Sequence, residues 1–192
     1  MIKSTRAEYK YFVPYSRYEM LLADLNKFTT PDSYSDTARD YYRISSIYFE
    51  NVRNQMYFEK IDGIAKRAKF RLRFYSTTPD KVYFVESKFK LFNRYIKRKT
   101  ILRTERIDDI LSPFAKNNGV LGQRELDEFL YYAKIYNFYP FIRIDYERKA
   151  VFDKFDKNIR ITFDRNIKCC RFSAGDLRFP DIPTFPGETV IL

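Results

Sequence analysis

Polar and apolar residues alternate strictly over residues 68–75, AKFRLRFY. The cations Lys69, Arg71 and Arg73 fall on one side of the alternation, and the apolar residues fall on the other. A period of two is typical of a β-strand, because successive side chains point to opposite faces of a sheet. The pattern therefore predicts a strand with one cationic face and one apolar face.

Similar patterns, with turn and capping residues between them, predict the other elements of the chain. We expect strands over residues 4–13, 42–50, 66–75, 81–90, 94–102, 141–152 and 159–164, and the beginning of a strand over 188–192. We expect helices over residues 16–28, with Ser16 as N-cap, 51–63, ending at Gly63, 106–116 and 125–136, and a loop over 29–40. Short turns between the three central strands favour antiparallel pairing.

Cations recur with the same period in several predicted strands. The residues that share such faces are Glu86, Lys88 and Lys90; Lys97 and Lys99; Tyr146 and Arg148; and Arg160, Thr162 and Asp164. One interpretation is a solvated face, which is typical of any single half-buried strand. The other is a barrel with a polar interior and apolar outer faces under helices, in which the converging cations line a phosphate channel.

Composition narrows the possible partners and chemistry. Lysine and arginine number 36 against 25 aspartates and glutamates, a net charge of +11, so we expect an anionic partner: nucleic acid, a membrane surface or a polyanionic small molecule. The chain has no histidine, which excludes histidine acid–base catalysis and histidine-ligated zinc. Cys169 and Cys170 are the only cysteines, and we expect them to be reduced in a cytoplasmic protein. We expect neither a signal peptide nor a membrane segment.

An ordered set of motifs resembles a known family. The motifs are EYKY, SSIYFEN, KFRLRFY, FVESKFK, IKRKTIL, IRIDYERKAVF and IRITFD. Together they resemble the VTC domain, the polyphosphate polymerase domain of the vacuolar transporter chaperone, which belongs to the CYTH-like superfamily of triphosphate tunnel metalloenzymes. The resemblance implies a single domain over residues 1–192 with an α+β fold. This fold is an antiparallel eight-stranded β-tunnel with a polar cationic lumen and flanking helices.

The resemblance also implies a function. It implies a metal-dependent phosphotransferase that moves the γ-phosphate of ATP onto a polyphosphate chain, with Mn²⁺ or Mg²⁺ as cofactor and with ATP and polyphosphate, or another triphosphate, as partners. The residues expected to be catalytic are Lys10, Arg71, Arg73, Arg148 and Arg160. The residues expected to bind phosphate are these five together with Lys69, Lys88, Lys97, Lys99 and Tyr146.

The metal ligands are where the sequence departs from the family. Family members end in a further strand whose glutamate holds the metal, whereas this sequence stops at Leu192. We therefore expect an incomplete last strand, a main metal ligand beyond Leu192 and a chain that is inactive if truncated. Glu8 and Glu86 are the remaining candidate metal ligands, and an ion pair with a neighbouring cation is the alternative for each. Asp164 is expected to pair with Arg160.

Two other functions remain open. A hydrolase on the same fold would cleave tripolyphosphate or an RNA 5′-triphosphate, but hydrolytic relatives carry several interior glutamates that this cation-rich lining lacks. A non-catalytic module would bind polyphosphate or RNA. An aromatic content of 19% suits base stacking, but the absence of an RNP motif, KH loop or helix-turn-helix argues against nucleic acid. The geometric expectation is that one enclosed channel receives Arg71, Arg73, Lys88, Arg148 and Arg160.

Overall fold

The computed structural model describes residues 8–32, 41–75, 82–92, 94–103, 124–172, 182–184 and 189–192. The chain divides into two compact units. The terminal unit comprises Met1–Arg43, Tyr146–Lys168 and Pro183–Leu192, and the central unit comprises Ile44–Asp145 and Cys169–Ile182. Each unit is described by itself.

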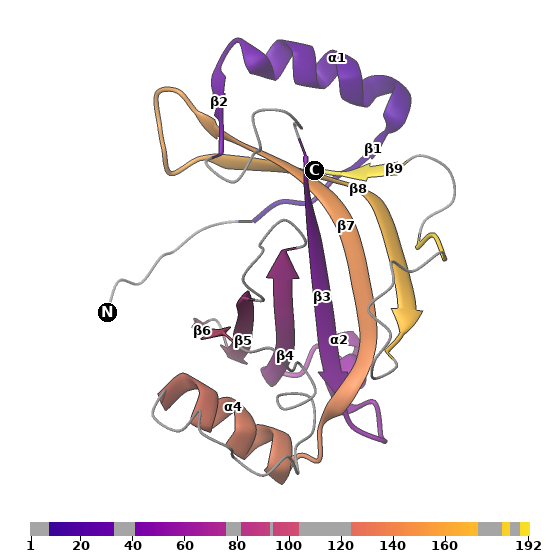
Figure 1. Ribbon diagram of the computed structural model, residues 1–192, viewed down its shortest axis with the longest axis vertical. Helices are drawn as coiled ribbons and strands as arrows, with labels where there is room; N and C mark the ends of the chain where they lie inside the picture. Colours follow the sequence, from indigo (N-terminus) through magenta and orange to yellow (C-terminus); the bar gives the residue numbers. More distant parts are fainter. Residues whose placement is uncertain are drawn as a thin grey trace. The chain divides into compact units, whose positions relative to one another are not determined.

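In these described ranges the chain forms nine strands and three helices (Figure 1). The strands are β1 (Phe12–Pro14), β2 (Thr29–Pro31), β3 (Tyr42–Glu50), β4 (Lys66–Tyr75), β5 (Val82–Leu91), β6 (Arg94–Arg103), β7 (Tyr139–Asp153), β8 (Arg160–Arg171) and β9 (Thr189–Ile191). The helices are α1 (Tyr15–Asn26), α2 (Gln55–Ile61) and α4 (Arg124–Ile135). The strand order is β1-β9-β8-β7-β3-β4-β5-β6, with β2 beside β7.

This arrangement is an α+β fold with a mostly antiparallel sheet. The strand order ends at β1 and at β6, and no pairing within the described residues closes the sheet between them. The strand predictions over residues 42–50 and 66–75 are confirmed, and those for β5 and β6 are correct to within one residue. The predicted hairpin of β7 and β8 and the predicted helix α4 are also confirmed.

In the central unit, β3 to β6 bury one face beneath α4. Leu72 of β4 pairs with Ile47 of β3 and with Val85 of β5, and all three side chains are buried in one core. The Phe70 ring lies 5.6 Å from the ring of Phe129 in α4. The apolar residues of AKFRLRFY therefore pack against α4, as expected of a sheet whose apolar face is covered by a helix.

The short helix α2 is fixed at both ends. The buried carboxylate of Glu50 accepts hydrogen bonds from the backbone N–H groups of Met56 and Tyr57, at 3.0 and 2.9 Å, which satisfies free donors of the first turn. Past the helix, Gly63 takes a φ of +68°, a conformation that glycine adopts without strain. The predicted short helix is thus confirmed, but over Gln55–Ile61 rather than 51–63.

In the terminal unit, α1 packs on β1, β2 and β9. Tyr18 is the buried residue of α1, and its ring meets that of Phe163 in β8 edge to face at 5.3 Å. Val151 of β7 and Val190 of β9 complete this second core. The predicted C-terminal strand is confirmed as β9, which pairs with β1 over three residues.

Two predictions near the N-terminus are wrong. Residues 8–11 form no strand, and β1 begins only at Phe12, although the backbones of Tyr11 and Leu192 exchange two hydrogen bonds of 2.9 Å. Ser16 is not the N-cap: the helix begins at Tyr15, and Pro14 occupies the capping position without a side-chain hydrogen bond.

The loop prediction over residues 29–40 is also wrong in its first part. Thr29–Pro31 pairs with Val151–Asp153 and forms β2. Three residues ending in proline carry no alternation, so this strand is fixed by its partner rather than by its own sequence. Asp32 lies outside any strand, whereas residues 33–40 of the loop and the predicted helix over residues 106–116 lie outside the described residues.

Candidate anion-binding site

The register of the central unit places cations from three strands on one face. Paired residues in an antiparallel sheet share a face and have Cβ atoms about 5 Å apart. Lys69, Lys88 and Lys97 occupy one such row across β4, β5 and β6, and Arg71, Glu86 and Lys99 occupy the next. We call this face, opposite the α4 side, the cationic face; its basic residues include Lys69, Arg71, Arg73, Lys88, Lys97 and Lys99.

Glu86 is the acidic residue in the middle of these rows. Its side chain is only 5% exposed, and both carboxylate oxygens meet cations: Arg71 Nε lies 2.5 Å from Oε2, and Lys97 Nζ lies 3.4 Å from Oε1. Burial alone would raise the pKa of Glu86, but the charges of Arg71, Arg73 and Lys97 outweigh it and lower the pKa. Glu86 is therefore ionised at neutral pH.

Positive charge still exceeds negative charge around Glu86. Arg71, Arg73, Lys97 and Lys99 all interact with this one carboxylate. Burial lowers the pKa of Lys99, the charge of Glu86 opposes that effect, and the neighbouring cations lower the pKa further. The Lys99 ammonium also lies 3.9 Å from the centroid of the Phe84 ring. Four cations around one carboxylate favour an additional anion.

Tyr48 is a member of this face that the sequence analysis did not identify. Its hydroxyl accepts a hydrogen bond from Arg71 Nη1 at 3.2 Å, and it pairs with Arg71 in the β3–β4 register. The alternation of SSIYFE is the signal that could have identified Tyr48. It puts Ser46 and Tyr48 on one face of the strand and the core residue Ile47 on the other.

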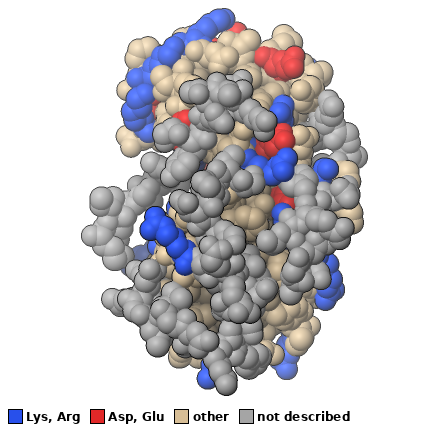
Figure 2. All heavy atoms as spheres, viewed as in Figure 1, with Lys and Arg blue, Asp and Glu red and all other residues tan. Residues whose placement is uncertain are grey.

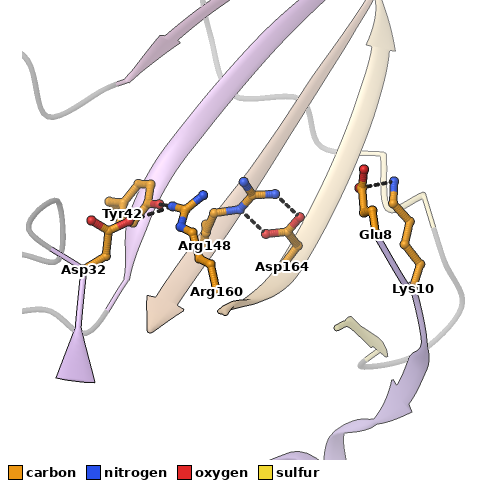
Figure 3. A network of polar contacts seen from close by, with 7 residues as sticks. All are labelled: Glu8, Lys10, Asp32, Tyr42, Arg148, Arg160 and Asp164. Carbon is orange, nitrogen blue, oxygen red and sulfur yellow. Dashed lines mark hydrogen bonds and ion pairs between the residues drawn. The ribbon is translucent and has the colours of Figure 1, made fainter. Parts of the chain in front are cut away.

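The two arginines of the terminal unit expected to be catalytic, Arg148 and Arg160, are already paired. Arg148 makes a bidentate contact with Asp164, with Nε–Oδ1 at 2.6 Å and Nη2–Oδ2 at 2.7 Å (Figure 3). Burial lowers the pKa of Arg148, but the hydrogen bond to Asp164 and the neighbouring charges raise it overall. Arg160 Nη2 donates to Asp32 Oδ2 at 2.6 Å and to the Tyr42 hydroxyl at 3.2 Å.

The predicted partner of Asp164 is therefore wrong: Asp164 pairs with Arg148 and not with Arg160. Arg160 stands four residues before Asp164 on the same strand, roughly 13 Å away at the usual rise. Arg148 comes from the neighbouring strand β7 and can present its planar fork to both carboxylate oxygens. Tyr146 is buried, and its ring lies 5.2 Å from the Arg148 guanidinium carbon.

Lys10 and Glu8 lie at the surface of the terminal unit. Their side chains form an ion pair at 3.3 Å and are 70% and 66% exposed (Figure 3). Glu8 thus takes the ion-pair alternative, as Glu86 does with Arg71. Among the described residues, no group of three acidic or cysteine side chains could hold a metal ion.

Surface charge alone does not locate the site. Figure 2 shows basic side chains at several separate places on the visible face, with acidic ones beside some of them. The pairing of β4, β5 and β6 is what joins cations into rows. The cationic face brings together six of the ten residues expected to bind phosphate. The other four belong to the terminal unit: Lys10, Tyr146, Arg148 and Arg160.

An antiparallel α+β protein with a basic strand face has the features of an anion-binding protein. Residues 5–190 match the family described as the VTC domain, and the chain belongs to this family. The resemblance found in the motifs is thus confirmed. The family is associated with polyphosphate polymerase activity. No curated protein matches the chain. None of the described helices has the length and apolarity needed to cross a membrane.

Proposed function

We propose that this protein is a polyphosphate polymerase-type phosphotransferase that moves the γ-phosphate of ATP onto a polyphosphate chain. The observation that carries the proposal is the cationic face, where Arg71, Arg73, Lys97 and Lys99 surround the buried carboxylate of Glu86. Membership of the VTC domain family supports the same substrate class.

The proposed reaction needs charge neutralisation and alignment. A terminal oxygen of polyphosphate attacks the γ-phosphorus of ATP, the bond from that phosphorus to the β–γ bridging oxygen breaks, and ADP leaves. Arg71 and Arg73 supply planar forks that match phosphate oxygens, and Lys97 and Lys99 supply compact positive charge. Such groups, fixed on paired strands, stabilise the charge that spreads over the transferred phosphoryl group.

We also propose that the strands form the β-tunnel that the family resemblance implies. The polarity of β4 to β6 supports this, because the apolar face packs beneath α4 and leaves the cations on the opposite face. Phosphate contacts by Lys10, Tyr146, Arg148 and Arg160 belong to the same proposal. Family membership supports these four roles.

The described residues do not fit a metal centre held by the protein. Both oxygens of Glu86 face cations, and Glu8 is exposed beside Lys10. We therefore derive no step from a protein-bound metal. The Mn²⁺ or Mg²⁺ requirement stays a prediction, as does the cytoplasmic location.

The direct test incubates the full chain with ATP and Mn²⁺ and follows both ADP release and polyphosphate length on gels. We expect chains to lengthen with one ADP per phosphate added, and Arg71→Ala/Arg73→Ala to lose at least about 100-fold in rate. Arg17→Ala/Lys27→Ala removes the same charge from exposed positions at α1 and should leave the rate unchanged.

Three outcomes would contradict the polymerase. Release of phosphate from tripolyphosphate without lengthening would establish the hydrolase. Binding of polyphosphate without turnover would establish a binding module. Equal rates for the wild type and Arg71→Ala/Arg73→Ala would move the reaction away from the cationic face.

A further inference from the structure

Within the part of the chain that the structure describes, two polar groups on the cationic side of the central unit are buried without a hydrogen-bond partner. They are the hydroxyl of Ser46 and Nε of Arg73. The Ser46 side chain is 1% exposed, so bulk water does not replace the missing partner. Buried polar groups are almost always hydrogen-bonded, and an unpaired one is unfavourable in the absence of a ligand or other compensation.

Both groups come from paired positions on one face. Ser46 of β3 lies opposite Arg73 of β4, and Tyr48 lies opposite Arg71 in the next row of that face. The hydrogen bond from Arg71 to the Tyr48 hydroxyl shows that side chains of this face meet across the two strands. Ser46 and Arg73 therefore place two unpaired groups next to the surplus charge around Glu86.

We propose that Ser46 and Arg73 form a subsite for one phosphate group of the bound chain. The inference rests on the proposed function. It adds a neutral hydroxyl of β3 to a site that otherwise consists of cations on β4, β5 and β6. The Ser46 O–H and the Arg73 Nε–H would donate to oxygens of the same phosphate. Because the Ser46 hydroxyl oxygen and Arg73 Nε are themselves buried, solvent competes little for these hydrogen bonds.

The test measures tripolyphosphate binding by calorimetry, together with urea unfolding of the full chain without ligand. Ser46→Ala should weaken binding about tenfold and leave the unfolding midpoint unchanged or higher, because it removes an unpaired hydroxyl. Ser45→Ala is the matched control. Ser45 is equally buried but pairs with Phe74 on the core face, so its substitution should leave the affinity unchanged.

A second variant keeps the test independent of folding defects. Arg73→Lys retains the positive charge but loses the Nε–H, and it should also weaken tripolyphosphate binding. If both residues bind one phosphate, the double variant Ser46→Ala/Arg73→Lys should lose less than the sum of the two single losses.

The outcomes separate the subsite from the proposed function. Loss of stability in Ser46→Ala with unchanged affinity would give the hydroxyl a purely structural role and overturn the subsite. If Arg71→Ala weakens binding but Ser46→Ala and Arg73→Lys do not, the subsite is contradicted while the phosphate site on the cationic face is still supported. If the wild type does not bind tripolyphosphate, both the subsite and the proposed function are contradicted.

Discussion

The arginines expected to be catalytic have opposite electrostatic settings in the two units. In the terminal unit, Arg148 pairs with Asp164 and Arg160 pairs with Asp32. In the central unit, the carboxylate of Glu86 faces four cations, and Arg73 Nε has no hydrogen-bond partner among the described residues. Both sets matched the family motifs, so the sequence pattern alone did not distinguish them.

This difference indicates where an anion binds most readily. A phosphate at Arg148 must compete with a bidentate carboxylate, whereas a phosphate at the cationic face relieves repulsion among like charges. The partners of an arginine, as well as its position in a motif, therefore decide whether it is ready to bind.

The largest effect is expected from breaking the Arg148–Asp164 pair. Asp164→Ala leaves a guanidinium that is only 16% exposed without its carboxylate, so unfolding free energy should fall by about 3 kcal/mol. Urea unfolding measures this change. Asp24→Ala, at the exposed pair with Lys27, is the control and should change stability by less than about 0.5 kcal/mol. Equal stability of Asp164→Ala and the wild type would mean that Arg148 does not depend on this carboxylate.

The next effect concerns the carboxylate of the cationic face. Glu86→Gln removes the negative charge among four cations, so stability without ligand should fall by about 1–3 kcal/mol. Metal-free tripolyphosphate should bind about threefold to tenfold more tightly, because the surplus charge has grown. Calorimetry and urea unfolding give the two values.

Glu128→Gln is the matched control for Glu86→Gln. Glu128 of α4 pairs with Arg98 of β6, which lies off the cationic face because it pairs with Ser87 rather than with Glu86 or Lys88. Its substitution should lower stability without changing tripolyphosphate affinity. If Glu86→Gln binds tripolyphosphate more weakly than the wild type only when Mn²⁺ is present, the result would instead support a metal-ligand role for Glu86.

A smaller effect is expected in the pH dependence of stability. The pKa of Glu86 is lowered from its ordinary value of 4.5, so the folded state binds this proton less readily than the unfolded state. The stabilisation is complete above about pH 5 and is lost as pH falls through the lowered pKa. Between about pH 5 and pH 3 the wild type should therefore lose more stability than Glu86→Gln. Parallel pH profiles of the two proteins would contradict this.

The smallest effect on stability is expected at Lys10. Its ion pair with Glu8 is exposed, so Lys10→Ala should change unfolding free energy by less than about 0.5 kcal/mol. The same variant tests the predicted phosphate contact, because tripolyphosphate affinity should fall if Lys10 binds the chain. A large loss of stability would show that Lys10 has a structural role instead.

The sequence was most informative where the pattern is long. Strands β4, β5 and β6 each run for ten residues with a period of two, and the short connections left antiparallel pairing as the simplest arrangement. Burial of the apolar row then requires the cations at the alternating positions, such as Arg71, to share the opposite face of the sheet. The cationic face could therefore be predicted from local sequence.

Features that depend on distant partners could not be predicted. The contacts of Arg160 with Asp32 and Tyr42 join residues 128 and 118 positions apart, and no local pattern encodes them. The length of β1 and the existence of β2 likewise follow from the strands they pair with. Ser46 lay within a quoted motif, but its lack of a hydrogen-bond partner is visible only in the structure.

The most direct test of the central claim is calorimetric titration of tripolyphosphate into the wild type, Arg71→Ala/Arg73→Ala and Arg17→Ala/Lys27→Ala, with unstructured RNA as comparison ligand. We expect micromolar or tighter binding by the wild type, at least about tenfold weaker binding by the Arg71/Arg73 variant and no change in the Arg17/Lys27 control. Equal affinity of all three proteins would contradict a phosphate site on the cationic face. Tight, salt-sensitive binding of RNA with little affinity for tripolyphosphate would identify a nucleic-acid module instead.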